Sequence, residues 1–293
     1  MQQHSYVYIS DGEYHSIRDY ILSFKYSKTK CYKLFLEKRV FLNDKLAKEN
    51  DKVKKNDIIK INDYIVKRRM VNENLNIIYE DDNTILINKN AGLLVHSDGN
   101  DKITLDDYVS AKFPEIPPMH VHRLDIDTTG IIMYALDPLS FSFYNDALTR
   151  HEIKRTYICL CEGIFKAKKG KINKAISTDR HINGKMVVCK NGKESITNYE
   201  VIEELNGASL VRVNLETGRT HQIRVHMSYL GHPLVGDSLY GSNIKANRVM
   251  LHSQKISFYQ PFLKKQIVEA IDLPNDMKKL MKHTGNMSIG KNE

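Results

Sequence analysis

The chain has 293 residues, 41% of them hydrophobic, which is enough for one large domain with a sizeable core and one small domain. No apolar run approaches the ~18 residues that span a bilayer, and the N-terminus lacks a basic segment followed by an apolar one, so we expect neither a membrane helix nor a secretory signal. The four cysteines have no CxxC spacing and are too sparse for a disulfide framework, which predicts reduced thiols in a cytoplasmic protein.

The net charge of +9 is concentrated near the N-terminus. Residues 14–69 hold 16 Lys and Arg against 7 Asp and Glu, an excess equal to the net charge of the whole chain. A basic segment beside a neutral one is typical of a polyanion-binding module attached to an enzyme. The charge run alone fits a solvated surface without a partner equally well.

The N-terminal segment predicts a helix pair followed by short strands. Ser16 and Ser27 each precede apolar residues at helical spacing, which predicts two capped helices. Residues 40–42 are strand-like and end at the Asn43-Asp44 turn pair, and residues 57–61 predict a second strand.

These residues resemble the αL RNA-binding module of the ribosomal protein S-four type, in which a helix pair leads to a V-x-[VL]-N strand and a later D-x-I-x-I strand. The matching segments are 40–43 and 57–61, with Arg39 and Asn56 in place of the usual glycines. The resemblance implies an RNA-binding domain over residues 1–70. Its phosphate contacts would come from Lys28, Lys30, Lys33, Lys38 and Arg39.

Beyond a polar linker at 67–76, the pattern predicts an α+β domain over 71–275, with a mixed or mostly antiparallel sheet and few helices. The expected strands are 77–82, 84–89, 156–161, 196–203, 208–215 and 249–258. The expected helices are 103–112, 140–150 and 221–230, the last capped by Thr220 and ended by Gly231. Residues 276–293 read as a polar tail that is disordered beyond about residue 284.

The run from His122 to Gly130 places an arginine and an aspartate between apolar segments, and such charges are costly to bury unless they are paired or used. His120 and His122 offer a different interpretation, because an H-x-H pair near Asp125 can bind a metal in a hydrolase, with His221 and His226 completing the set. The surrounding spacing matches no metal-binding signature.

The same run resembles the HRLD-x-x-T-[ST]-G motif of RluA-type pseudouridine synthases, and the similarity extends over about 74–265. Residues 91–96 match AGLLVH, and 218–227 match GR-[ST]-HQ-[IL]-RVH-M, followed by 231–237 and 251–252. Residues 155–157, Arg-Thr-Tyr, resemble the K-x-Y segment. The resemblance implies an α+β catalytic domain with a central, mostly antiparallel sheet and a cleft across it, preceded by the small α/β RNA-binding domain.

The resemblance also implies roles for individual residues. Asp125 would be catalytic, Tyr157 would stack on the target base and handle a proton, and Arg224 would pair with Asp125. Arg123 would fill the space left by the flipped base, and the remaining RNA contacts would come from Arg219 and His221. Large-subunit ribosomal RNA is the first expected partner and transfer RNA the second. No cofactor and no metal is implied, and we expect a monomer that does not bind membranes.

Pseudouridine formation breaks the bond between ribose C1′ and uracil N1 and rebuilds it to C5, with no redox step. A carboxylate can attack C1′, add to C6, or remove the C2′ proton, and the sequence leaves these three routes open. A non-catalytic RNA-binding protein that keeps the fold is the other alternative. An intact Asp-Tyr-Arg set argues against it, because a binding protein does not need one.

Overall fold

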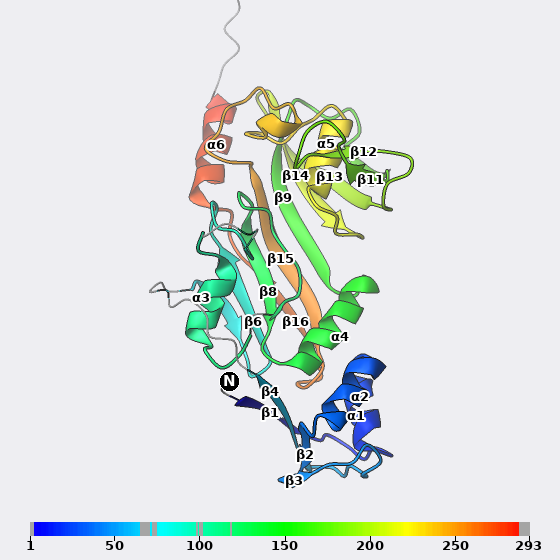
Figure 1. Ribbon diagram of the computed structural model, residues 1–293. Helices are drawn as coiled ribbons and strands as arrows, with labels where there is room; N and C mark the ends of the chain where they lie inside the picture. Colours follow the sequence, from blue (N-terminus) through cyan, green and yellow to red (C-terminus); the bar gives the residue numbers. More distant parts are fainter. Residues whose placement is uncertain are drawn as a thin grey trace, which may run out of the picture.

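A computed structural model describes residues 3–64, 71, 75–97, 99, 102–117 and 119–286. Figure 1 shows a small N-terminal module beside one end of a larger domain, which we call the main domain. The module contains β1 (Gln3–Ile9), α1 (Ile17–Ser23), α2 (Lys28–Leu36), β2 (Val40–Leu42), β3 (Lys45–Leu46) and β4 (Ile58–Tyr64). Its strands form one sheet in the order β1-β4-β2-β3.

The predicted helix pair of this module is confirmed, including its caps. The Ser16 hydroxyl accepts a hydrogen bond from the Asp19 amide at 3.0 Å, and Ser27 does the same for Lys30 at 3.5 Å. Strand β1 was not predicted. Its exposed face carries Val7 and Ile9, so the alternation of polar and apolar residues that marks a half-buried strand is missing.

The main domain is built on a ten-stranded, mostly antiparallel sheet, and the predicted α+β class is confirmed. Its central path runs β10-β13-β14-β9-β15-β8-β6-β5, with β16 beside β15 and β7 beside β8. The strands are β5 (Ile77–Glu80), β6 (Thr84–Lys89), β7 (Met119–His120), β8 (Thr129–Ala135), β9 (Lys154–Glu162), β10 (Lys169–Asn173), β13 (Ile196–Leu205), β14 (Ala208–Leu215), β15 (Leu251–Gln260) and β16 (Lys265–Ala270). A separate hairpin pairs β11 (Ile176–Thr178) with β12 (Met186–Val188).

The three predicted helices of this domain are present as α3 (Leu105–Lys112), α4 (Pro138–Thr149) and α5 (Gln222–Tyr229), and a short 3-10 helix η1 covers Ser238–Tyr240. Within the described ranges, no helix is long and apolar enough to cross a membrane. Most of the expected linker at 67–76 lies outside the described residues.

The C-terminal segment differs from the expected polar tail. Residues Asn275–Asn286 form helix α6, because Met277 is fully buried and Leu280 and Met281 pack against the same apolar cluster. The other buried members of that cluster come from β9, β14 and the segment before β15. The expected disorder beyond about residue 284 falls mostly on 287–293, which lie outside the described residues.

A parallel strand pair interrupts the antiparallel sheet at its centre and places the HRLD segment beside it. Strand β8 pairs with β15 in parallel, with Gly130 opposite Ser253. Gly130 has φ +110°, and an added Cβ would lie 2.2 Å from the Ser253 carbonyl oxygen. Only glycine therefore fits this position, and the chain enters β8 directly beside β15.

The N-terminal module packs tightly against α4 and the turn between β15 and β16. Leu139 of α4 is fully buried in the module's own apolar cluster. Phe262 stacks on Phe24 and Tyr8, with ring centroids 4.6 and 5.7 Å apart. The Tyr8 hydroxyl also donates to the buried Asp137 carboxylate, which caps α4, at 2.8 Å. The interface combines apolar burial with a directional hydrogen bond and fixes the module in one orientation.

We expect Phe262→Ala to loosen this docking selectively. Loss of the half-buried ring should cost about 2 kcal/mol, below the usual range for a fully buried Phe. Hydrogen exchange should accelerate in residues 17–36, while β9 and β14 keep their protection. Leu263→Ala, at a 47% exposed neighbour, is the matched control and should change neither. Equal loss of protection in both domains would contradict an interface that can loosen locally.

Candidate active site

A cleft of about 430 Å³ lies where the loop before β8 faces the start of β9 and the connection from β14 to α5. Six of the predicted site residues line it: Asp125, Tyr157, Arg224, Arg123, Arg219 and His221. They come from segments about 30 to 100 positions apart in the chain, so the fold brings together what the motifs predicted separately.

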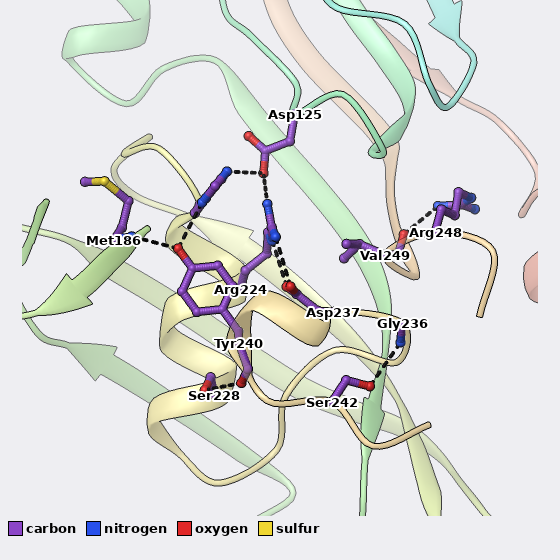
Figure 2. A network of polar contacts seen from close by, with 11 residues as sticks. Asp125, Met186, Arg224, Ser228, Gly236, Asp237, Tyr240, Ser242, Arg248 and Val249 are labelled. Atoms are coloured by element: carbon purple, nitrogen blue, oxygen red, sulfur yellow. Dashed lines mark hydrogen bonds and ion pairs between the residues drawn. The ribbon is translucent and has the colours of Figure 1, made fainter. Parts of the chain in front are cut away.

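Arg224 is shared between two carboxylates. Its Nε and Nη2 donate to the two oxygens of Asp237 at 2.7 and 2.9 Å, and its Nη1 donates to Asp125 Oδ2 at 3.4 Å (Figure 2). Asp237 is buried, whereas the Asp125 side chain is 27% exposed toward the cleft. Burial lowers the pKa of Arg224, but hydrogen bonding and the charge of Asp237 outweigh it and the net shift is upward. The expected Arg224–Asp125 pair is therefore present, with Asp237 as the closer partner.

Gln222 fixes the start of α5. Its side-chain oxygen accepts from Thr217 Oγ1 and the Arg219 amide, at 2.8 and 3.0 Å, and its amide nitrogen donates to Ile196 and Thr197. The predicted cap at Thr220 is wrong. His221 occupies the cap position, in the left-handed conformation and without a side-chain cap bond.

Two buried cations hold the loop that carries Asp125. Lys89, 1% exposed, donates to the carbonyls of Asn90, Leu93 and Ile126 at 2.8–2.9 Å. Arg248 Nη1 donates to the Asp127 carbonyl at 3.4 Å. Hydrogen bonds therefore anchor the loop backbone at the two residues that follow Asp125, and this fixes the direction of the Asp125 side chain.

Arg248 connects this loop to the C-terminal helix. Its Nε and Nη2 donate to the two oxygens of Asp276, at 2.6 and 3.0 Å, and Asp276 stands in the first turn of α6. Helix α6, which lies outside the expected catalytic domain, therefore helps to position the cleft.

Tyr157 lies on β9 in the wall of the cleft and is buried, with its neighbour Arg155 beside it. Burial raises the pKa of the Tyr157 hydroxyl; Arg155 opposes the rise and Asp125 adds to it. The phenol therefore keeps its proton at neutral pH. The Arg155 Nε and both ring nitrogens of the buried His122 have no hydrogen-bond partner within the described part of the chain.

The other residues predicted to contact RNA differ in whether their side chains already bind groups within the protein. Arg123 is exposed and lies 3.1 Å from His96 Nε2, whereas Arg219 Nε donates to the Glu194 carbonyl. On the N-terminal module, Lys28, Lys30, Lys33 and Lys38 are exposed. Arg39 is engaged within the protein, because its guanidinium donates to the Asn62 carbonyl and to Glu37. Lys28, Lys30 and Lys33 lie on α2, and Lys38 and Arg39 follow it; Figure 1 shows α2 at the opposite end of the molecule from α5.

Residues 83–229, half of the chain, match the sequence profile described as RNA pseudouridylate synthase. The chain belongs to this family. It is similar to the RNA pseudouridine synthase YhcT of Bacillus subtilis strain 168, with 39% identity over 214 residues that cover 70% of this chain and 71% of the relative. The enzyme is thus an RNA pseudouridine synthase, an isomerase.

Two further proteins are similar to this chain, one in sequence over nearly its whole length and one in its solved structure. The ribosomal large subunit pseudouridine synthase D of Buchnera aphidicola is 34% identical over 288 residues, which cover 88% of this synthase and 90% of the relative. The solved structure of human RNA Pseudouridylate Synthase Domain Containing 1 aligns with a TM-score of 0.58 and 26% identity over 72% of this chain and 95% of that chain.

These findings decide against both alternatives raised by the sequence. His120 Nδ1 lies 3.3 Å from Asp106 Oδ1, and His122 is buried. His226 is engaged with Thr197 and Lys174. Among the described residues, no three His, Cys, Asp or Glu side chains form a set suited to a metal ion. Family membership, in turn, excludes the interpretation of a non-catalytic binding protein.

Sequence reasoning missed the residues that support Asp125 from behind. Asp237 and Tyr240 contact Arg224, the latter with its ring 5.0 Å from the guanidinium carbon. Asp237 is the last residue of the matched run 231–237, so the sequence signal was an acidic residue at the end of a motif, to which no role had been assigned. Its partner could not be chosen without the fold.

We expect the stability contributed by Lys89 to depend on pH. Burial lowers the pKa of Lys89 to about 8, although Asp127 and Asp125 oppose the shift. The unfolded chain keeps this proton up to about pH 10.4, so between these values it binds more protons than the folded chain, and the free energy of unfolding rises with pH. The stability of wild type relative to Lys89→Met should increase from pH 8 to 10, as measured by urea unfolding. A constant difference would contradict a buried, titrating Lys89.

Proposed function

We propose that this synthase modifies uridines in large-subunit ribosomal RNA and that Asp125 is its catalytic residue. The observation that carries the proposal is the asymmetric support of one carboxylate. Arg224 and His221 both face Asp125 Oδ2, at 3.4 and 3.8 Å (Figure 2). Among the residues that the structure describes, no side-chain hydrogen bond or ion pair reaches the other oxygen. A carboxylate held by one oxygen presents the other to a substrate in the cleft.

The reaction needs one carboxylate and a group that keeps the detached uracil in the cleft. The C1′–N1 bond breaks, the uracil turns, a C1′–C5 bond forms, C5 loses its proton and N1 gains one. Asp125 begins this sequence by attack on C1′, addition to C6 or removal of the C2′ proton, and all three use an aimed carboxylate oxygen.

Tyr157 is suited to hold the detached base. Its ring forms part of the cleft wall and is packed from behind by the apolar cluster of β9 and β14. Aromatic faces stack on bases with about 1–3 kcal/mol per contact. Because burial raises the Tyr157 pKa, the protonated hydroxyl is available as a donor to the uracil during its rotation.

Arg123 and the N-terminal module are proposed to bind the rest of the RNA. The exposed guanidinium of Arg123 stands two residues before Asp125, where it can occupy the gap left by a flipped uridine. Exposed Lys28, Lys30 and Lys33 line α2 and are placed to contact phosphates.

The similarity that covers this module as well as the cleft supports ribosomal RNA as the substrate. The Buchnera relative, named a ribosomal large subunit enzyme, aligns over 88% of this chain. Transfer RNA is the second candidate.

Asp125→Asn should abolish catalysis while leaving RNA binding unchanged, because the amide keeps the shape and loses the charge. Pseudouridine formation should fall at least about 10³-fold, equivalent to ~4 kcal/mol in the barrier. Asp127→Asn, two residues along the same loop, is the matched control and should stay within about threefold. Turnover by Asp125→Asn near the wild-type rate would end the proposal.

The same pair of variants identifies the substrate in cells that lack the gene. Mapping should show that wild type and Asp127→Asn restore pseudouridine at defined positions of large-subunit ribosomal RNA, whereas Asp125→Asn does not. Restoration in transfer RNA alone would contradict the ribosomal assignment.

Lys28, Lys30 and Lys33 should supply salt-dependent affinity. Replacing all three by Gln in the full chain should flatten the slope of log K against log salt by roughly two to three units, because about 0.7–0.9 units are lost per phosphate contact. The control replaces Lys52, Lys54 and Lys55 by Gln in an exposed loop of the same module. Equal effects of the two triples would mean that net charge, and not α2, sets the affinity.

A further inference from the structure

His221 has a backbone conformation that is uncommon for a residue with a side chain. It precedes α5 with φ +56° and ψ 17°, in the left-handed region that residues with a side chain rarely adopt. Such outliers cost free energy and persist where the surrounding structure imposes them. Here the conformation sets the imidazole between Tyr240 and Asp125. Nδ1 lies 2.9 Å from the Tyr240 hydroxyl and Nε2 lies 3.8 Å from Asp125 Oδ2.

The partners of Tyr240 determine which ring nitrogen of His221 carries the proton. The backbone amide of Met186 donates to the Tyr240 hydroxyl oxygen at 2.9 Å (Figure 2). That oxygen therefore acts as an acceptor toward Met186, and its own proton remains to be donated. No acceptor other than His221 Nδ1 lies within hydrogen-bond distance of this hydroxyl among the residues that the structure describes. With Nδ1 accepting, the proton of the neutral ring is on Nε2.

The charge state of the ring agrees with this arrangement. Burial lowers the pKa of His221 below its usual 6.5; Asp125 opposes the shift and Arg224 adds to it. The imidazole is therefore neutral at neutral pH and has a single N–H, which faces the carboxylate. Arg224 approaches the same oxygen, so N–H groups face Oδ2 from two directions.

We infer that His221 is a positioning residue whose Nε2–H holds Asp125, and that Tyr240, itself held by Met186, selects this tautomer. The inference rests on the proposed catalytic role of Asp125. At 3.8 Å the contact is longer than a hydrogen bond, and hydrogen bonds of catalytic groups commonly shorten when substrate binds. The β11–β12 hairpin, which carries Met186, is thereby coupled to the position of the carboxylate. This role differs from the RNA contact that the sequence predicted for His221.

The tautomer can be measured without reference to catalysis. In protein labelled with ¹⁵N-histidine, the ring-nitrogen shifts of His221, assigned by their loss in His221→Gln, should report a neutral ring protonated on Nε2. Tyr240→Phe keeps the ring over Arg224 and removes only the hydroxyl, so His221 should then populate both tautomers. A ring protonated on Nδ1 in wild type, or no change in Tyr240→Phe, would overturn the inference.

Two substitutions separate positioning from RNA binding. Asn tolerates the left-handed conformation and is too short to reach Asp125, whereas a Gln amide extends to the position of Nε2. In single turnovers at saturating enzyme, the rate of pseudouridine formation by His221→Asn should be about 100-fold below that of wild type. The rate of His221→Gln should recover most of that loss. Both should bind RNA as wild type does. Equal rates for the two variants, or weaker RNA binding in parallel with the rate, would overturn the inference.

The two proposals fail in different ways. If Asp125→Asn retains activity while the Nε2–H tautomer is found, the catalytic role of Asp125 is wrong and the hydrogen-bond chain is right. If Asp125→Asn is inactive and the tautomer is reversed, the catalytic role stands and His221 does not hold the carboxylate through Nε2.

Discussion

The division of one guanidinium between two carboxylates is the constraint around which the cleft is built. Asp237 takes two of the donors of Arg224 in a buried, bidentate pair, which leaves Nη1 for Asp125. Removing one partner of a buried ion pair typically costs several kcal/mol, because the other charge is left without compensation. Asp237 therefore cannot vary independently of Arg224, and the pair sets where Asp125 can rest.

The surroundings of Asp237 serve this geometry. Gly236 has φ +82°, and an added Cβ would lie 2.1 Å from the Arg248 carbonyl oxygen. The chain can therefore turn closely past Arg248 and deliver Asp237 beneath Arg224. Arg248 in turn holds Asp276 and the Asp127 carbonyl, so the C-terminal helix, the turn and the loop of Asp125 are connected through buried guanidinium groups.

Local signals predicted most of the elements, and tertiary partners account for what was missed. Ser16 and Ser27 predicted the starts of their helices, because a cap hydrogen bond joins residues within four positions of each other. Strands β10 and β16 and the β11–β12 hairpin were missed because they are short or lie at sheet edges, where neither face needs an apolar pattern. In the cleft, motifs identified Asp125, Tyr157 and Arg224. The choice of Asp237 and Tyr240 as their supports depends on a turn whose path follows from Gly236, and no spacing rule encodes it.

The docking of the N-terminal module has a consequence for how a target is selected. Phe262 and the Tyr8–Asp137 bond join the N-terminal module to α4 and to the turn between β15 and β16 of the main domain. If α2 contacts the RNA as proposed, the separation between α2 and the cleft would limit which uridines reach Asp125. A target uridine would need a matching distance and angle from the RNA segment on α2, so the shape of the folded RNA would contribute to the choice of base.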